Sequence, residues 1–160
     1  ALPIFTDVVD STSLTERLGD AAFRERAHQL DDALRLVIRE GGGTPVEGKV
    51  LGDGVMAVFT SARQAIDAAR RCREAADDVG LQLHLGIHAG DVIRDGNNVY
   101  GGAVNLAARI AAHSEPDEIL VSDVVRGLAR TSAGVAFEDC GEHELKGIAD
   151  PQRLYAIRDH

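Results

Sequence analysis

The sequence predicts a mixed α+β domain, and three observations predict it. Apolar runs of strand length at 2–9, 81–93 and 118–121 alternate with longer segments whose apolar residues recur at helical spacing. A short hairpin pattern, centred on glycines 52 and 54, lies between two of the helical segments. The length of 160 residues is that of one domain, with enough chain to bury a core.

The first elements are expected to be a strand and two helices. The strand at 2–9 carries Asp7 near its end, and Ser13 with Glu16 forms a capping box that opens a short helix. Gly19-Asp20 breaks this helix. The segment 21–40 then shows apolar residues at helical spacing, and the triple glycine at 41–43 ends it.

The remaining elements follow the central hairpin, 46–59. Ser61 opens a helix that runs to Val79, and 81–93 is a strand in which His84 and His88 lie too far apart to chelate one metal. The later elements are a turn at 95–98, helices at 103–113 and 122–129, and strands at 118–121, 135–140 and 154–157.

Composition restricts the partners. The formal net charge of −9 disfavours nucleic acid and anionic membrane surfaces, and it means that a polyphosphate needs metal ions or local basic groups to bind. Two cysteines, Cys72 and Cys140, make neither a disulfide framework nor a zinc site. With no membrane-spanning run and no signal peptide, we expect a cytoplasmic domain that makes no membrane contact. The start at Ala1 without methionine suggests a fragment of a longer protein, whose own membrane anchoring stays open.

Three positions of the hairpin and first strand suit a charged ligand. Asp53 stands between two glycines, where little bulk shields its carboxylate, and Lys49 lies four residues earlier. Asp7 ends a strand just before the free amides of a helix N-terminus, a ready anion site. The alternatives are an ordinary Asp-Gly hairpin with a solvated lysine, and an aspartate that caps the helix.

The helix at 103–113 carries two polar residues among apolar ones. Asn105 and Arg109 are one turn apart and share a face. Because the helix is expected to be largely buried, both need partners, which are either acids of the fold or a charged ligand. Lys146, in a turn before Pro151, is by composition a surface lysine.

Five segments together resemble the class III nucleotidyl cyclase catalytic domain of the bacterial adenylyl cyclase type. They are FTDVVDST at 5–12, EGKVLGDGVMAVF at 47–59, LHLGIHAGDVI at 83–93, VYGGAVNLAARI at 99–110 and FEDCGEHELKGIADPQRLYAI at 137–157. The resemblance implies a ferredoxin-like βαββαβ core with an added C-terminal hairpin, an antiparallel-rich sheet flanked by helices. It also implies a head-to-tail homodimer with composite active sites at its interface.

The resemblance implies a role for each matching position. Asp7, Asp53 and the carbonyl of Val8 match the ligands of two divalent cations, Mg²⁺ or Mn²⁺. The positions that match substrate-binding ones are Val9, Asp10, Ser11 and Thr12, whose amides hold the triphosphate, Lys49, which reads adenine, and Lys146, which contacts the phosphates. Asn105 and Arg109 match the pair that orients the ribose and stabilises the transition state. The expected reaction converts ATP into cyclic AMP and pyrophosphate.

Asn98 departs from the family pattern, because adenylyl cyclases usually carry an aspartate there. An asparagine carbonyl accepts from adenine, but its amide nitrogen could equally donate to guanine, so relaxed selectivity between ATP and GTP is one alternative. A non-catalytic nucleotide-binding module of the same fold is a second. Another two-metal enzyme, such as a diguanylate cyclase or a polymerase, is a third. A diguanylate cyclase would be expected to carry a GGDEF-like turn where this chain has LGDGV, and the acidic charge opposes the template binding of a polymerase.

Overall fold

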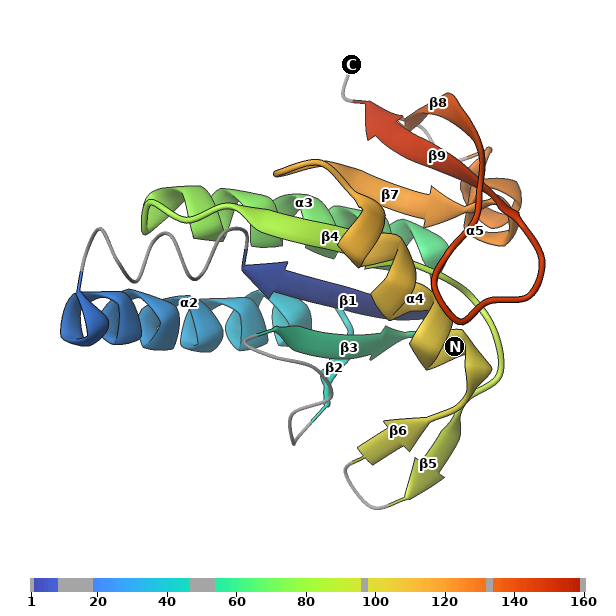
Figure 1. Ribbon diagram of the computed structural model, residues 1–160. Helices are drawn as coiled ribbons and strands as arrows, with labels where there is room; N and C mark the ends of the chain where they lie inside the picture. The colour runs from blue at the N-terminus through green and yellow to red at the C-terminus, as the bar shows by residue number, and fades with distance from the viewer. Residues whose placement is uncertain (1, 9–18, 47–53, 96–97, 132–133, 159–160) are drawn as a thin grey trace.

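The computed structural model describes residues 2–8, 19–46, 54–95, 98–131 and 134–158. Figure 1 shows a twisted sheet with helices on both sides. In chain order the elements are β1 (Leu2–Val8), α2 (Asp20–Glu40), β2 (Thr44–Pro45), β3 (Val55–Phe59), α3 (Ala62–Asp78), β4 (Leu83–Ile87), β5 (Ile93–Asp95), β6 (Asn98–Tyr100), α4 (Gly102–His113), β7 (Ile119–Ser122), α5 (Asp123–Ala129), β8 (Ala136–His143) and β9 (Gln152–Arg158).

The main sheet has seven strands in the order β2-β3-β1-β4-β7-β9-β8. Of these pairs β4–β7 is parallel and the others are antiparallel. Strands β5 and β6 form a separate hairpin, which projects from the sheet in Figure 1. The predicted α+β class, with its antiparallel-rich sheet and its C-terminal hairpin β8–β9, is confirmed.

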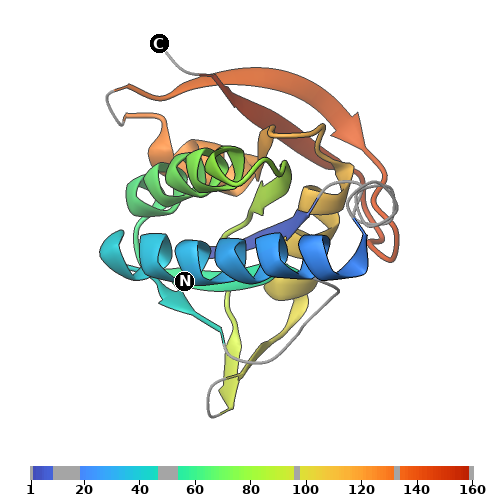
Figure 2. The same ribbon diagram turned by 90° about the vertical axis from the view of Figure 1, so that its left-hand side faces the viewer.

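Helices cover both faces of the sheet, as the two views show (Figures 1 and 2). Strand β3 shows the consequence, because all five of its residues are buried. Val55, Ala57 and Phe59 pack in the cluster that holds α2, α3 and α5, whereas Met56 and Val58 pack with α4. Successive side chains of a strand point to opposite faces, so a strand between two helical layers is apolar throughout.

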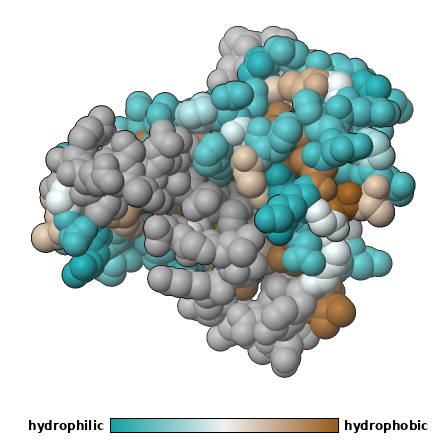
Figure 3. All heavy atoms as spheres, viewed as in Figure 1, coloured by the Kyte–Doolittle hydropathy of each residue, from teal (hydrophilic) through white to brown (hydrophobic). Residues whose placement is uncertain are grey.

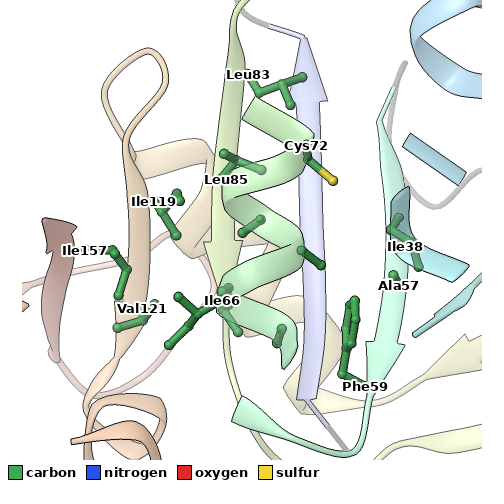
Figure 4. Close-up of a cluster of buried hydrophobic side chains, with 14 of the residues drawn as sticks. Ile38, Ala57, Phe59, Ile66, Cys72, Leu83, Leu85, Ile119, Val121 and Ile157 are labelled. Atoms are coloured by element: carbon green, nitrogen blue, oxygen red, sulfur yellow. The ribbon is translucent and has the colours of Figure 1, made fainter. Parts of the chain in front are cut away.

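The largest of the three apolar clusters among the described residues lies under α2 and α3 (Figure 4). Helix α2 contributes Leu30, Leu34 and Ile38, which recur at helical spacing and are at most 3% exposed. Cys72 of α3 is fully buried there. Burial raises the pKa of its thiol to about 12, so it is an inert apolar side chain at neutral pH.

Local signals set the ends of these helices. The side chain of Ser61 accepts a hydrogen bond from the Gln64 amide at the start of α3, and Gly80 follows this helix with φ +75°. Gly41 is the C-cap of α2, so the glycine run ends that helix as predicted. The predicted capping box of Ser13 and Glu16 lies outside the described residues.

The predicted strand at 81–93 is wrong in its extent. Strand β4 ends at Ile87, and pairing resumes only in the β5–β6 hairpin, where Asp95 lies opposite Asn98. At Gly90 the chain passes so close to α4 that a Cβ would lie 2.9 Å from the Cβ of Ala103. Packing against the helix therefore takes precedence over sheet pairing in this segment.

Candidate functional site

An open pocket of about 230 Å³ lies between α4 and the turn that follows β8. Its lining residues are Arg109, Ala112 and His113 from the helix and Glu144, Leu145 and Lys146 from the turn. Figure 3 shows mostly hydrophilic side chains, with smaller hydrophobic areas between them, over the C-terminal strands and turn on this face. The lining of this pocket thus includes two cationic side chains, Arg109 and Lys146, and one acidic side chain, Glu144, in a chain whose net charge is −9.

Helix α4 presents Asn105 and Arg109 as predicted, one turn apart on the side away from the core. Asn105 is exposed and Arg109 is half-buried. The buried face of α4 consists of other residues: Ala103, Val104, Ala107, Ala108, Ile110 and Ala111. In the part of the chain that the structure describes, neither polar side chain forms a hydrogen bond or an ion pair with an acid of the fold.

The residues next to Lys146 fix the backbone conformation of the turn that carries it. Leu145 is 6% exposed and packs with Ile110 of α4 in a small apolar cluster under β7 and β9. Its carbonyl accepts a hydrogen bond from the Ile148 amide at 3.0 Å, and Gly147 has the positive φ of +79° that this turn needs. Lys146 itself is exposed and lines the pocket, so this predicted position and Arg109 line one cavity.

The other wall residues were not predicted from the sequence. His113 follows Arg109 by one helical turn, and that spacing alone could have placed it beside the arginine. Its Nε2 atom lies 3.0 Å from Nδ1 of His143, the last residue of β8. No sequence pattern relates these two histidines, because their contact depends on how β8 packs beside α4.

The predicted metal ligands of the first strand lie at the end of β1. Asp7 pairs in register with His84 of β4, and Val8 pairs with Leu83. The other predicted positions of this group, Asp53 and Val9–Thr12, lie outside the described residues, as does Lys49. Among the described residues no group of three or more His, Cys, Asp or Glu side chains is arranged to hold a metal. Asn98 begins β6, in the projecting hairpin.

The direction of helix α4 shows where Asp7 and Asn105 lie along it. It runs antiparallel to β4, because Ser114 contacts His84 through a 2.8 Å hydrogen bond, whereas Ala103 approaches Gly90. Asp7 therefore lies beside the C-terminal end of α4. The segment from Asn105 to Ser114 spans about 13 Å along the helix axis, so Asn105 lies toward the opposite end.

The histidine of β4, His84, and the one just after that strand, His88, each contact a neighbouring element. Nδ1 of His84 hydrogen bonds the Ser114 carbonyl, and Nδ1 of His88 lies 2.8 Å from the Ser122 hydroxyl. Burial lowers the pKa of His88. Each histidine therefore links β4 to a neighbouring element and takes no part in the pocket.

Comparison with known proteins places the chain in one family. A model of the adenylate and guanylate cyclase catalytic domain matches residues 3–159. An uncharacterized protein of Mycobacterium tuberculosis is 30% identical over 158 residues, covering 98% of this chain and 40% of that protein. A pH-sensitive adenylate cyclase of the same species is 28% identical over 160 residues, covering 96% and 39%. This chain thus spans about two fifths of the length of both relatives.

Structural similarity agrees with the sequence comparison. The crystal structure of the adenylyl cyclase CyaB from P. aeruginosa superposes with a TM-score of 0.82 at 23% identity, covering 99% of this chain and 93% of that one. The fold is therefore the ferredoxin-like fold of these domains, as the sequence predicted. No helix in the described part of the chain has the length and apolar character needed to cross a membrane. Because the family match spans nearly the whole sequence, the chain belongs to the adenylate and guanylate cyclase catalytic domain family, the class III cyclases.

Proposed function

We propose that this chain converts ATP into 3′,5′-cyclic AMP and pyrophosphate at sites shared by two copies in a head-to-tail homodimer. The observation that carries the proposal is the pocket that Arg109 and Lys146 both line. Two cations that line one cavity from different elements suit a chain of phosphates, because each can bind a different phosphoryl group. Family membership supplies the class of reaction.

The reaction is an intramolecular displacement. The ribose 3′-oxygen attacks the α-phosphorus, the new O–P bond closes the ring, and the bond from the α-phosphorus to the bridging oxygen breaks to release pyrophosphate. The proton of the hydroxyl passes to solvent. We assign no side chain as the base.

The residues of α4 and of the turn have different roles in the proposed reaction. Arg109 offers a planar fork of donors to the α-phosphoryl oxygens, where charge develops in the transition state. Asn105, one turn away, orients the ribose so that its 3′-oxygen is in line with the leaving group. Lys146 binds the β- and γ-phosphates, which leave as pyrophosphate. These are the roles that the resemblance implies for these positions.

A carboxylate at the end of β1 fits the cation requirement. Asp7, Asp53 and the carbonyl of Val8 offer oxygen donors, the ligands that Mg²⁺ and Mn²⁺ prefer. When bound, two such ions lower the pKa of the attacking hydroxyl and neutralise charge on the pyrophosphate.

A composite site is what the family resemblance implies. Within one chain, Asp7 lies beside the C-terminal end of α4 and Asn105 lies toward its other end. A partner related by two-fold symmetry brings the Asp7 end of one chain against the Asn105 end of the other, twice per dimer.

Base selection rests on Lys49 and Asn98. A lysine at position 49 favours adenine, since the guanylyl cyclases of the family place a glutamate there to accept from guanine. Asn98 accepts or donates with equal ease, so we expect preference for ATP with measurable turnover of GTP.

The test is a cyclase assay with Mn²⁺ and with ATP and GTP in parallel, at several concentrations of the chain. Cyclic AMP should form faster than cyclic GMP, and the specific activity should rise with protein concentration as dimers form. Binding of ATP without any cyclic product would instead identify a nucleotide-binding module without activity. A linear dinucleotide product from GTP would identify a different two-metal enzyme.

A further inference from the structure

A pair of histidines joins the two walls of the pocket. Nε2 of His113 in α4 and Nδ1 of His143 in β8 are 3.0 Å apart, and the ring centroids are separated by 4.4 Å with an angle of 56° between the planes. His113 lies one turn beyond Arg109, and His143 lies three residues before Lys146. The pair therefore links the elements that carry the two cations.

The hydrogen-bond partners fix the protons of this pair at neutral pH. Nε2 of His143 lies 2.7 Å from the Cys140 carbonyl, which can only accept, so that nitrogen carries a proton. In a neutral imidazole the other nitrogen, Nδ1, is then bare and accepts. It follows that Nε2 of His113 is the donor, and this assignment comes from the hydrogen-bond pattern.

We propose that His143 is a positioning residue for Lys146: the hydrogen bond from His113 holds the turn at 144–149 at the separation from α4 at which Lys146 and Arg109 bind one polyphosphate. The proposal rests on the proposed function and deepens it. Leu145 already ties the middle of the turn to Ile110 through the apolar cluster that also holds Leu120, Leu154 and Ala156. The histidine pair supplies a second, directional tie at the start of the turn.

Two substitutions at one position test the role of the bond. His143→Ala removes the acceptor, and because a net hydrogen bond contributes about 1 kcal/mol we expect the KM for ATP to rise about three- to tenfold, with a smaller change in kcat. His143→Asn places a carbonyl oxygen where Nδ1 stood, so it should recover most of that loss. Equal KM values for wild type and His143→Ala would overturn the proposal.

A matched control separates positioning from the general effect of losing a histidine. His28 is an exposed histidine of α2 that faces Asp32, and His28→Gln should leave the KM for ATP unchanged. A rise in KM for His28→Gln equal to that for His143→Ala would contradict the proposal.

Two readouts do not need catalysis. Nitrogen-15 NMR of the imidazoles should show His143 protonated at Nε2 and bare at Nδ1 at pH 8, and the reverse tautomer would contradict the assignment. Calorimetry with inorganic pyrophosphate should show binding by wild type that weakens about three- to tenfold in His143→Ala. Absence of cyclic product together with these two results would reject the proposed function alone. Equal pyrophosphate affinity in both chains would reject the positioning role alone.

Discussion

Arg109 and Lys146 enter the pocket from different elements and carry different chemistry. The guanidinium offers a rigid fork that matches phosphoryl oxygens, whereas the ammonium is a mobile point charge. Arg109 is half-buried in the wall of α4 and Lys146 is exposed on the turn. We therefore assign transition-state stabilisation to the arginine and ground-state binding of the leaving phosphates to the lysine.

This division predicts different kinetic losses. Arg109→Ala should lower kcat by about a hundred- to a thousandfold, the usual effect of removing one donor to a developing oxyanion. Lys146→Ala should mainly raise the KM for ATP. Steady-state kinetics with ATP and Mn²⁺ measures both. Arg130→Ala, at an exposed arginine beyond α5, is the charge-matched control and should behave as wild type. Losses of the same kind from both pocket variants would contradict the division.

A second prediction at this scale concerns Cys72. Burial raises the pKa of its thiol from an ordinary value of 9.0 to about 12, so in the folded chain it stays protonated well above neutrality. The raised pKa adds stability that is fully present below pH 9 and is lost as the pH rises from about 9 toward 12. Half-buried Cys140 is the internal comparison.

Alkylation at pH 8 with detection by mass spectrometry checks this prediction. Iodoacetamide should modify Cys140 in the native chain and Cys72 only after denaturant is added. Rapid native labelling of Cys72 would show that the core under α3 opens more readily than its full burial implies.

At the scale of elements, α4 can lie against β4 because Gly86 has no side chain. A Cβ on Gly86 would stand 2.4 Å from the backbone nitrogen of Ala111 and 2.8 Å from the Ala107 carbonyl. Backbone cannot move aside as a flexible side chain can. The contact therefore fixes the height of the helix above the sheet, and with it the position of Arg109.

Gly86→Ala should consequently destabilise the fold by about 1–3 kcal/mol, the usual cost of overpacking. Urea unfolding followed by circular dichroism measures the change. The matched control is Gly127→Ala in α5, where an added Cβ meets nothing within 4 Å and the helix should gain about 0.5–1 kcal/mol. A neutral Gly86→Ala variant would mean that α4 sits farther from β4 than the structure indicates.

Element boundaries were predictable where local chemistry sets them. Ser61 and Gly41 mark helix ends by a cap and a glycine, and the structure agrees with both. The C-terminal hairpin is longer than predicted, because charged pairs extend it beyond its apolar centre. Arg158 bonds Glu138 at 2.7 Å and lowers the pKa of that exposed carboxyl, and Arg153 bonds Asp139 at 2.9 Å. These charged residues do not follow the alternating apolar pattern from which a strand is predicted.

At the scale of the whole molecule, the described candidate residues come from different parts of the chain. Asn105 and Arg109 lie on α4 and Lys146 on the adjoining turn, whereas Asp7 lies near the end of β1, beside the C-terminal end of that helix. Sequence motifs identified these residues individually, but their separation along α4 depends on packing at Gly86 and at Gly90, which no local pattern encodes. The contact between His113 and His143 was not predicted, because it too depends on packing.

Subunit complementation tests the composite site most directly. Asp7→Ala and Asn105→Ala homodimers should each lose nearly all cyclase activity, because each change disables both sites. In a mixed dimer one site combines both substitutions and the other has neither, so random mixing in equal amounts should restore about one quarter of wild-type activity. Mass spectrometry of the intact dimers measures how much mixed dimer forms. Mixed dimers that form readily and stay as inactive as the two parents would contradict the shared site.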